Sequence, residues 1–116
     1  MNEKEENLMI VAGTCADFFS IDINFLTSKT RKLEACQPRQ IAHYIAKEIF
    51  PTYPLGLIGN VIGMKSHATI LHSCKTIKNL METDVAVRAY MDNLIPYVRD
   101  RLGDRIINKN SWMPCI

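Results

Sequence analysis

The stretch GMKSHATILHSCKTI, residues 63–77, decides the fold because it joins the signal for a sharp turn to the signal for an amphipathic helix. Ser66 is suited to cap that helix, since its hydroxyl can accept a hydrogen bond from a backbone N–H one turn later. The apolar members of the stretch recur at the spacing of a single helix face, which we expect to be buried: Ile70, Leu71, Cys74 and Ile77.

A short apolar segment, LGLIGNVI at residues 55–62, precedes this stretch and has the composition of another helix. Gly63 then allows the chain to turn sharply, because glycine adopts backbone angles that other residues avoid. Helix, tight turn and capped helix make up the helix-turn-helix arrangement, in which the first turn of the second helix enters the major groove of DNA. We therefore predict a recognition helix at residues 67–81.

Two blocks of sequence carry a resemblance to a known family. The pattern G-x-K-x-H-x-T-x-x-H-x-C-x-x-I begins at Gly63 and follows PRQIA at residues 38–42 and AKE at residues 46–48. Together they resemble the C-terminal DNA-binding domain, domain IV, of the bacterial chromosomal replication initiator DnaA. The resemblance implies an all-α, Trp-repressor-like bundle of five to six helices that contains the helix-turn-helix. It implies this domain at residues 1–103, and the irregular sequence that follows predicts a C-terminal tail at residues 104–116.

The chain before residue 50 has the periodicity of three helices. Residues 4–19 have near-helical apolar spacing, and Asp22 can cap a short helix that runs through Leu26. A third helix is expected to open at Gln37, with Pro38 in its first turn, where a missing N–H costs nothing. Its buried stripe is predicted to contain Ile41, Ala42, Ile45, Ala46 and Ile49.

A last helix is expected from Val85 to about Leu102, with Asp84 as its N-cap. Pro96 falls within this helix and should kink or interrupt it, and Gly103 is a suitable stop. The predicted inner face contains Val87, Tyr90, Met91, Leu94, Ile95 and Val98.

Positive charge is concentrated around the helix-turn-helix, although the whole chain has a net charge of only +2. Residues 1–28 carry one Lys and five acidic side chains, residues 29–81 carry eight Lys or Arg and two Glu, and residues 82–116 carry five of each sign. The net charges of the three segments are therefore −4, +6 and 0. A basic centre in a nearly neutral protein is expected of a phosphate-binding face. An ordinary solvated surface is the simpler alternative.

The connector TSKTRK, residues 27–32, is polar and cationic and has no apolar period, so we expect a loop. Flexible basic loops reach into the minor groove of DNA, whose narrow A·T segments attract arginine. Arg31 stands eight residues before Arg39, and the family resemblance implies that it makes such a minor-groove contact. Without the resemblance, a solvated loop arginine would be the favoured interpretation.

The resemblance also assigns roles to residues outside the loop. It implies that Arg39, Gln40 and Lys47 contact the phosphate backbone, which fixes register without reading sequence. His67 can donate to a base-edge acceptor or to a phosphate, and Thr69 can meet a thymine methyl or a phosphate oxygen. We also expect a phosphate contact from Lys65. Simple solvated charges remain the alternative for Arg39 and Lys47.

The sequence departs from the family pattern at the start of the recognition helix, where SHAT at residues 66–69 stands in place of Asp-His-Thr-Thr. Asp accepts a hydrogen bond from the cytosine amino group, whereas Ser66 can donate or accept and so discriminates less. Ala68 keeps a methyl group for contact with thymine but lacks the hydroxyl. Each altered bidentate contact changes discrimination by about 1 to 3 kcal/mol. We therefore expect the same docking pose with an altered base preference.

Other classes of function have weaker support. Cys15, Cys36, Cys74 and Cys115 form no C-x-x-C pair, which is typical of reduced thiols in the cytoplasm, where we expect a nucleoid-associated protein. His67, His72 and Cys74 lack the spacing of a zinc motif, so we expect no metal and no cofactor. The chain also offers no oriented nucleophile and base, so we expect no enzyme. The apolar runs fall short of the ~20 residues that a membrane span needs, so a membrane is not an expected partner.

The alternative to a double-stranded DNA-binding protein is a protein-interaction module. A degenerate helix-turn-helix surface, or the tail around Trp112, would then bind another protein, and an exposed apolar patch beside a neutral recognition helix would be its sign. Met1 and the tail beyond the last helix favour a complete small protein over a fragment of a longer initiator.

Overall fold

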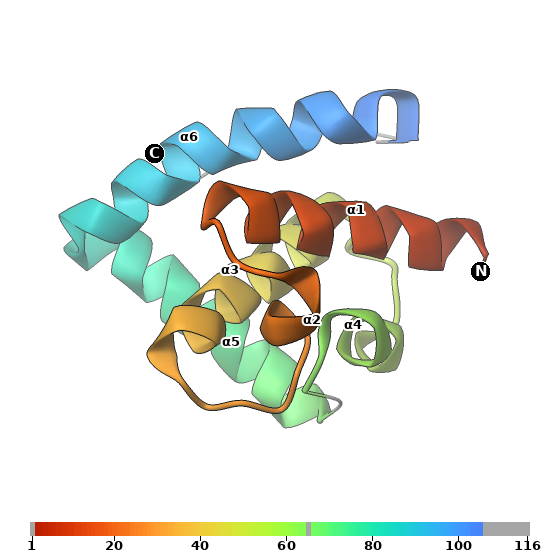
Figure 1. Ribbon diagram of the computed structural model, residues 1–116, viewed down its shortest axis with the longest axis horizontal. Coiled ribbons are helices and arrows are strands. Elements are labelled where there is room, and N and C mark those ends of the chain that lie inside the picture. Colours follow the sequence, from red (N-terminus) through yellow and green to blue (C-terminus); the bar gives the residue numbers. More distant parts are fainter. Residues whose placement is uncertain (1, 65, 106–116) are drawn as a thin grey trace.

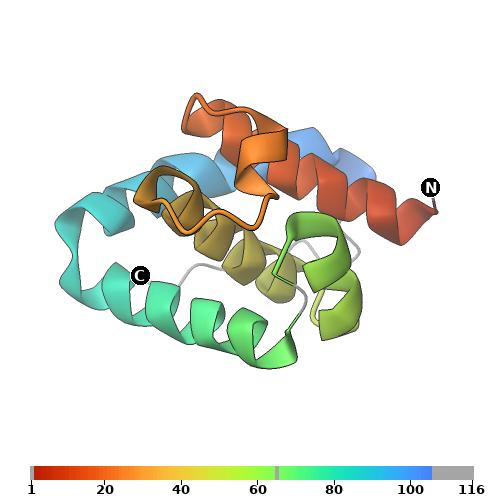
Figure 2. The same cartoon turned by 60° about the horizontal axis from the view of Figure 1, so that its bottom comes forward.

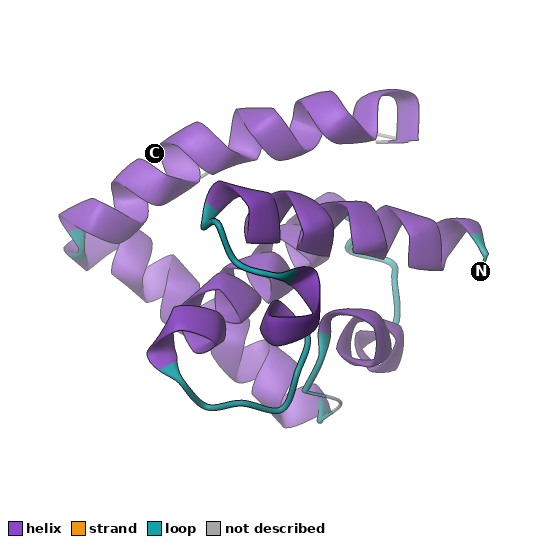
Figure 3. Ribbon diagram, viewed as in Figure 1, coloured by secondary structure: helices purple, strands orange, loops and turns teal. Residues whose placement is uncertain are grey.

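The computed structural model describes residues 2–64 and 66–105, and these residues form helices and loops without a strand (Figures 1 and 3). The predicted all-α fold is therefore confirmed. The helices are α1 (Glu3–Phe18), α2 (Ile23–Leu26), α3 (Leu33–Ile49), α4 (Leu55–Ile62), α5 (His67–Thr83) and α6 (Val85–Leu102), followed by the 3-10 turn η1 (Gly103–Arg105).

Helix α3 lies at the centre of the bundle and packs against α1, α2, α4 and α5. Figure 1 shows α1 and α6 side by side on one side of α3, and Figure 2 shows α5 on another side. The predicted stripe of α3 is confirmed, since all five of its apolar residues are buried. The apolar faces of the helices around α3 pack with this stripe into one hydrophobic core.

The start of α3 differs from the prediction. The helix begins at Leu33, four residues before the expected start at Gln37, so that Pro38 lies inside the helix and not in its first turn. Pro38 is buried, and Ala35 in the additional first turn is fully buried. Burial of Ala35 and Pro38 offsets the single backbone hydrogen bond that proline removes.

The predicted helix-turn-helix is present as α4, a turn at Gly63, and α5. Gly63 has a φ of 112°, which is the left-handed region that glycine occupies most easily. A Cβ atom at this position would lie 2.7 Å from the carbonyl oxygen of Thr27. Ser66 caps α5 as predicted, because its hydroxyl accepts from the backbone N–H of Thr69 at 3.5 Å. The turn is thus fixed by backbone angle, by close packing and by a cap.

Three further expectations need correction. Leu71, which was expected to be buried with Ile70, is 52% exposed, because the core-facing stripe of α5 passes through Ile70, Ser73, Ile77 and Met81 instead. Tyr90 of the predicted inner face of α6 is 36% exposed. Pro96 does not interrupt α6, which continues to Leu102 with the proline side chain exposed.

The predicted tail is only partly described. In η1, Arg105 donates to the side chain of Asn7 at 3.0 Å and lies 3.4 Å from a carboxylate oxygen of Glu6. Residues 106–116, including Trp112 and Cys115, lie outside the described residues, as does Lys65. The boundary between a domain at 1–103 and a tail at 104–116 stays a prediction.

Replacing Leu8 by Ala should lower the free energy of unfolding by about 2 to 5 kcal/mol, because Leu8 is fully buried in the core. The matched variant Leu33→Ala removes the same atoms from a side chain that is 71% exposed, and it should change stability by less than about 0.5 kcal/mol. Urea unfolding followed by circular dichroism measures both. Equal losses in the two variants would contradict the assignment of the core.

Candidate nucleic-acid interface

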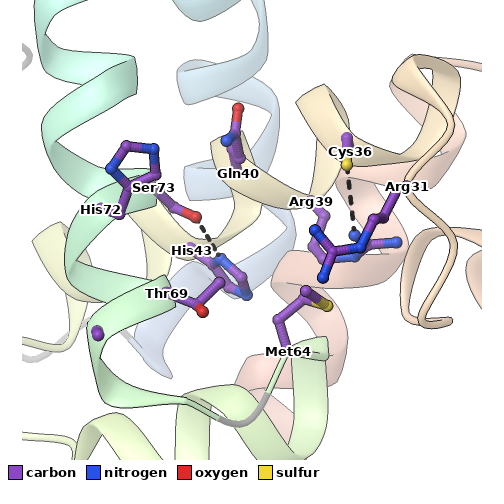
Figure 4. A pocket seen from close by; sticks show the side chains of 10 residues that line it. Arg31, Cys36, Arg39, Gln40, His43, Met64, Thr69, His72 and Ser73 are labelled. Atoms are coloured by element: carbon purple, nitrogen blue, oxygen red, sulfur yellow. Dashed lines mark hydrogen bonds between the residues drawn. The ribbon is translucent and has the colours of Figure 1, made fainter.

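An open cavity of about 380 Å³ lies between the basic loop, α3 and the start of α5 (Figure 4). A second cavity, of about 450 Å³, lies between the basic loop, the end of α4 and the turn. Arg31, Met64 and Thr69 line both cavities. Arg31 and Thr69 are far apart in the sequence, yet the fold brings them to one surface, which we call the loop–helix surface, made of residues 27–31, 39–40, 59–64 and 66–72.

Arg39 is almost completely buried, at 2% exposure, and it lines the first cavity. Its Nε donates to the carbonyl oxygen of Leu26 at 2.7 Å, and its Nη1 lies 3.8 Å from the sulfur of Cys36. Its Nη2 has no hydrogen-bond partner among the described residues. No described carboxylate forms an ion pair with Arg39. A buried guanidinium normally has its charge and donors satisfied, so an anion from outside would complete this site.

The first turn of α5 presents its polar side chains outward. Ser66, His67 and Ala68 are exposed, and Thr69 is half-buried in the wall that faces Arg31. The ring of His67 lies against the first turn of α4, where a Cβ on Gly56 would come within 3.3 Å of His67 Nε2. The absence of a side chain at Gly56 leaves room for the ring. These residues can offer hydrogen-bond donors, acceptors and methyl groups to a ligand.

The remaining predicted contacts differ in position. Gln40 lines the first cavity beside Arg39. Lys47 lines neither cavity. Its side chain is half-buried, and its Nζ donates to the carbonyl oxygen of Pro51 at 3.0 Å. The structure therefore brings Arg31, Arg39, Gln40 and the start of α5 together and leaves Lys47 at the other end of α3.

Sequence reasoning missed His43, which is fully buried in α3. Its Nε2 lies 2.9 Å from the carbonyl oxygen of Gly63, and its Nδ1 lies 3.1 Å from the hydroxyl of Ser73, as Figure 4 shows for Ser73. Burial lowers the pKa of His43 to about 4, although the bond to Gly63 opposes the shift. The available signal was a histidine within the apolar stripe of α3, two residues before Ile45.

Two of the cysteines, Cys15 and Cys74, are shielded by burial. Burial raises the pKa of the Cys15 thiol to about 12 and that of the Cys74 thiol to about 11, so both are protonated at neutral pH. Cys36 lines the first cavity. Within residues 2–64 and 66–105, no three His, Cys, Asp or Glu side chains gather as a metal site would require. No helix in the described part of the chain is long and apolar enough to cross a membrane.

A family model described as "Bacterial dnaA protein helix-turn-helix" matches residues 9–77, a range that includes every residue lining the two cavities. The chain belongs to the DnaA helix-turn-helix family. The DnaA match runs from α1 to the middle of α5, so it covers both the scaffold around α3 and the loop–helix surface.

Three curated relatives carry the name chromosomal replication initiator protein DnaA. The DnaA of Flavobacterium psychrophilum is 37% identical over 79% of this chain and 19% of its own length. The DnaA of Bacteroides thetaiotaomicron is 40% identical over 66% of this chain and 16% of its own length, and that of Bacteroides fragilis is 37% identical over 72% and 17%. The chain thus spans less than a fifth of the length of these initiators.

The buried, neutral His43 makes stability depend on pH. Its pKa is about 4 in the folded protein against an ordinary value of 6.5, so the unfolded chain binds a proton first as the pH falls. The stabilisation of the folded state by neutral His43 is complete above about pH 6.5 and is lost progressively as the pH falls toward 4. The free energy of unfolding should be roughly 2 to 3 kcal/mol lower at pH 4.5 than at pH 7.5 from this group.

Urea unfolding of the wild type, His43→Gln and His72→Gln at both pH values tests this. The exposed His72 is the matched control and should leave the pH dependence unchanged. His43→Gln should remove the part of the pH dependence of the free energy of unfolding that comes from the buried imidazole. A wild-type pH dependence in His43→Gln would show that His43 is not held neutral.

Proposed function

We propose that this chain is a sequence-specific double-stranded DNA-binding protein that acts in replication initiation or its regulation, in the manner of DnaA-box recognition. It would work at the chromosome, in the cytoplasm. The start of the recognition helix α5 enters the major groove, and the basic loop carries Arg31 into the adjacent minor groove. The single observation that supports this most is that Arg31 and Thr69 line the same cavities. One duplex can then meet loop and helix together.

In the major groove, His67 donates to an acceptor on a base edge, and Thr69 contacts a thymine methyl or a phosphate oxygen. Ser66 and Ala68 supply a weakly discriminating hydroxyl and a methyl group. Leu71 adds a further apolar contact, because its exposed side chain lies one turn after His67 on the same helix. This set reads thymine methyls and hydrogen-bond acceptors and lacks the carboxylate that would read a cytosine amino group.

The phosphate backbone supplies most of the affinity. Arg39 lines the first cavity, and among the described residues its buried charge has no carboxylate partner and its Nη2 no hydrogen bond, which supports an anionic partner at this position. Gln40 adds a contact beside Arg39, and Lys65 adds a further phosphate contact. Lys47 acts from the far end of α3, where its ammonium group releases Pro51 to reach a phosphate. These contacts fix the register of the duplex without reading its sequence.

The interaction-module alternative has less support. Among the described residues of α5, Leu71 is the one large apolar side chain counted as exposed, and the other exposed large apolar residues lie at the starts of α3 and α6 or along α6: Leu33, Val85, Tyr90 and Tyr97. None of these four residues lies on the recognition helix, and the tail around Trp112 lies outside the described residues.

Arg31→Ala and His67→Ala should each reduce the affinity for the preferred duplex by about 5- to 150-fold, because each removes about 1 to 3 kcal/mol of base readout. Affinity for a scrambled duplex should fall much less. The preferred duplex comes from binding-site selection out of a random pool, and fluorescence anisotropy measures both affinities. Equal losses on selected and scrambled DNA would contradict base readout by these residues.

Lys47→Ala should weaken binding to all duplexes alike. It should also reduce the slope of log affinity against log salt concentration by about one, since one phosphate contact is lost. Lys78→Ala removes an exposed lysine farther along α5 and serves as the matched control, with an unchanged slope. No binding of the wild type to any duplex at low salt would overturn the proposed function itself.

A further inference from the structure

His43 is a buried polar residue whose two ring nitrogens are both engaged, and neither partner belongs to its own helix. The carbonyl oxygen of Gly63 can only accept, so His43 Nε2 carries the proton and donates to it at 2.9 Å. Burial lowers the pKa of His43 to about 4, so the ring is neutral at pH 7, and Nδ1, without a proton, accepts from the hydroxyl of Ser73 at 3.1 Å. The two bonds hold the neutral ring in one tautomer and one orientation.

The two partners of His43 bracket the part of the chain that we assign to base reading. Gly63 ends α4 before the recognition helix begins, and Ser73 lies on α5 one turn after Thr69. His67 and Thr69 fall between these two anchor points. His43 thus connects α3 to both ends of the reading segment, while Arg39 lies one turn earlier on the same face of α3 and lines the cavity with Thr69.

Gly63 also joins the basic loop to this arrangement. Its Cα lies so close to the backbone of Thr27 that a Cβ would stand 2.7 Å from the Thr27 carbonyl oxygen. Thr27 is the residue at which the loop bearing Arg31 leaves α2. The carbonyl of the same glycine is held by His43. The backbone of Gly63 therefore contacts the loop that bears Arg31, forms the turn, and is hydrogen-bonded to α3.

We propose that His43 is a positioning residue for sequence readout: through Gly63 and Ser73 it sets the orientation of the first two turns of α5 relative to α3 and the basic loop, so that the two DNA-reading elements fit one duplex. The proposal rests on the proposed function. His43 itself touches no DNA. An apolar side chain of similar size could fill the same space, but it lacks the directional bonds that fix the angle of the helix.

The test compares the affinity ratio between the selected duplex and a scrambled duplex of the same composition, measured at one salt concentration. His43→Leu should stay folded and keep its affinity for scrambled DNA, but the ratio should fall at least tenfold. Ser73→Ala removes one bond and should lower the ratio several-fold. His43→Gln can still donate to Gly63 and should retain more of the ratio than His43→Leu. Ile45→Val, a fully buried change in the same helix, is the control for lost stability and should leave the ratio unchanged.

Nitrogen-15 NMR of the wild-type histidines gives a readout that packing alone does not produce, since His43 should show a protonated Nε2 and an unprotonated Nδ1 at neutral pH. Unchanged ratios in folded His43→Leu and Ser73→Ala, with discrimination intact in the wild type, would overturn the positioning role and leave the proposed function standing. If His43→Leu does not fold, an unchanged ratio in both Ser73→Ala and His43→Gln overturns it in the same way. A wild type that binds selected and scrambled DNA equally would overturn the proposed function instead.

Discussion

The junction at Gly63 is the constraint on which the rest of the structure depends. The backbone there has a φ of 112°, leaves no room for a side chain against Thr27, and directs its carbonyl to His43. Any other residue would meet both backbone strain and a clash with the loop. The angle between α4 and α5, the path of the basic loop and the place of α3 are therefore linked at one residue, and the loop–helix surface results from that link.

Burial of polar groups distinguishes this surface from an ordinary solvated one. Arg39 and His43 lie one turn apart on α3 and are both buried, yet their requirements differ. The neutral His43 has two hydrogen-bond partners inside the protein, so it holds α3, the turn and α5 in a fixed arrangement. Among the described residues, Arg39 has only a carbonyl oxygen and a thiol as hydrogen-bond partners. An anion would satisfy this buried cation, whose side chain lines an open cavity, and the proposed function gives that place to a DNA phosphate.

Much of the fold could be predicted from local patterns, because helix stripes, caps and turn glycines act over a few residues. The α3 stripe, the Ser66 cap and the Gly63 turn are of this kind. The prediction that Leu71 is buried was wrong because the spacing of apolar residues does not show which edge of a helix its neighbours cover. The predicted place of Pro38 in the first turn was wrong because the sequence does not show that Ala35, in the turn before it, is buried. The bonds of His43 to Gly63 and Ser73 join segments far apart in the chain, and no local pattern predicts them.

The most direct test of the account is an NMR titration of the nitrogen-15-labelled protein with the selected duplex, in which the shifts of the backbone amide signals are measured. We predict the largest shifts at residues 27–31, at Arg39 and Gln40, and at residues 66–72, with the amides of α1 and of the outer side of α6 almost unchanged. Largest shifts on α1 and α6, or an unaffected basic loop, would contradict the claim that loop and recognition helix bind one duplex together.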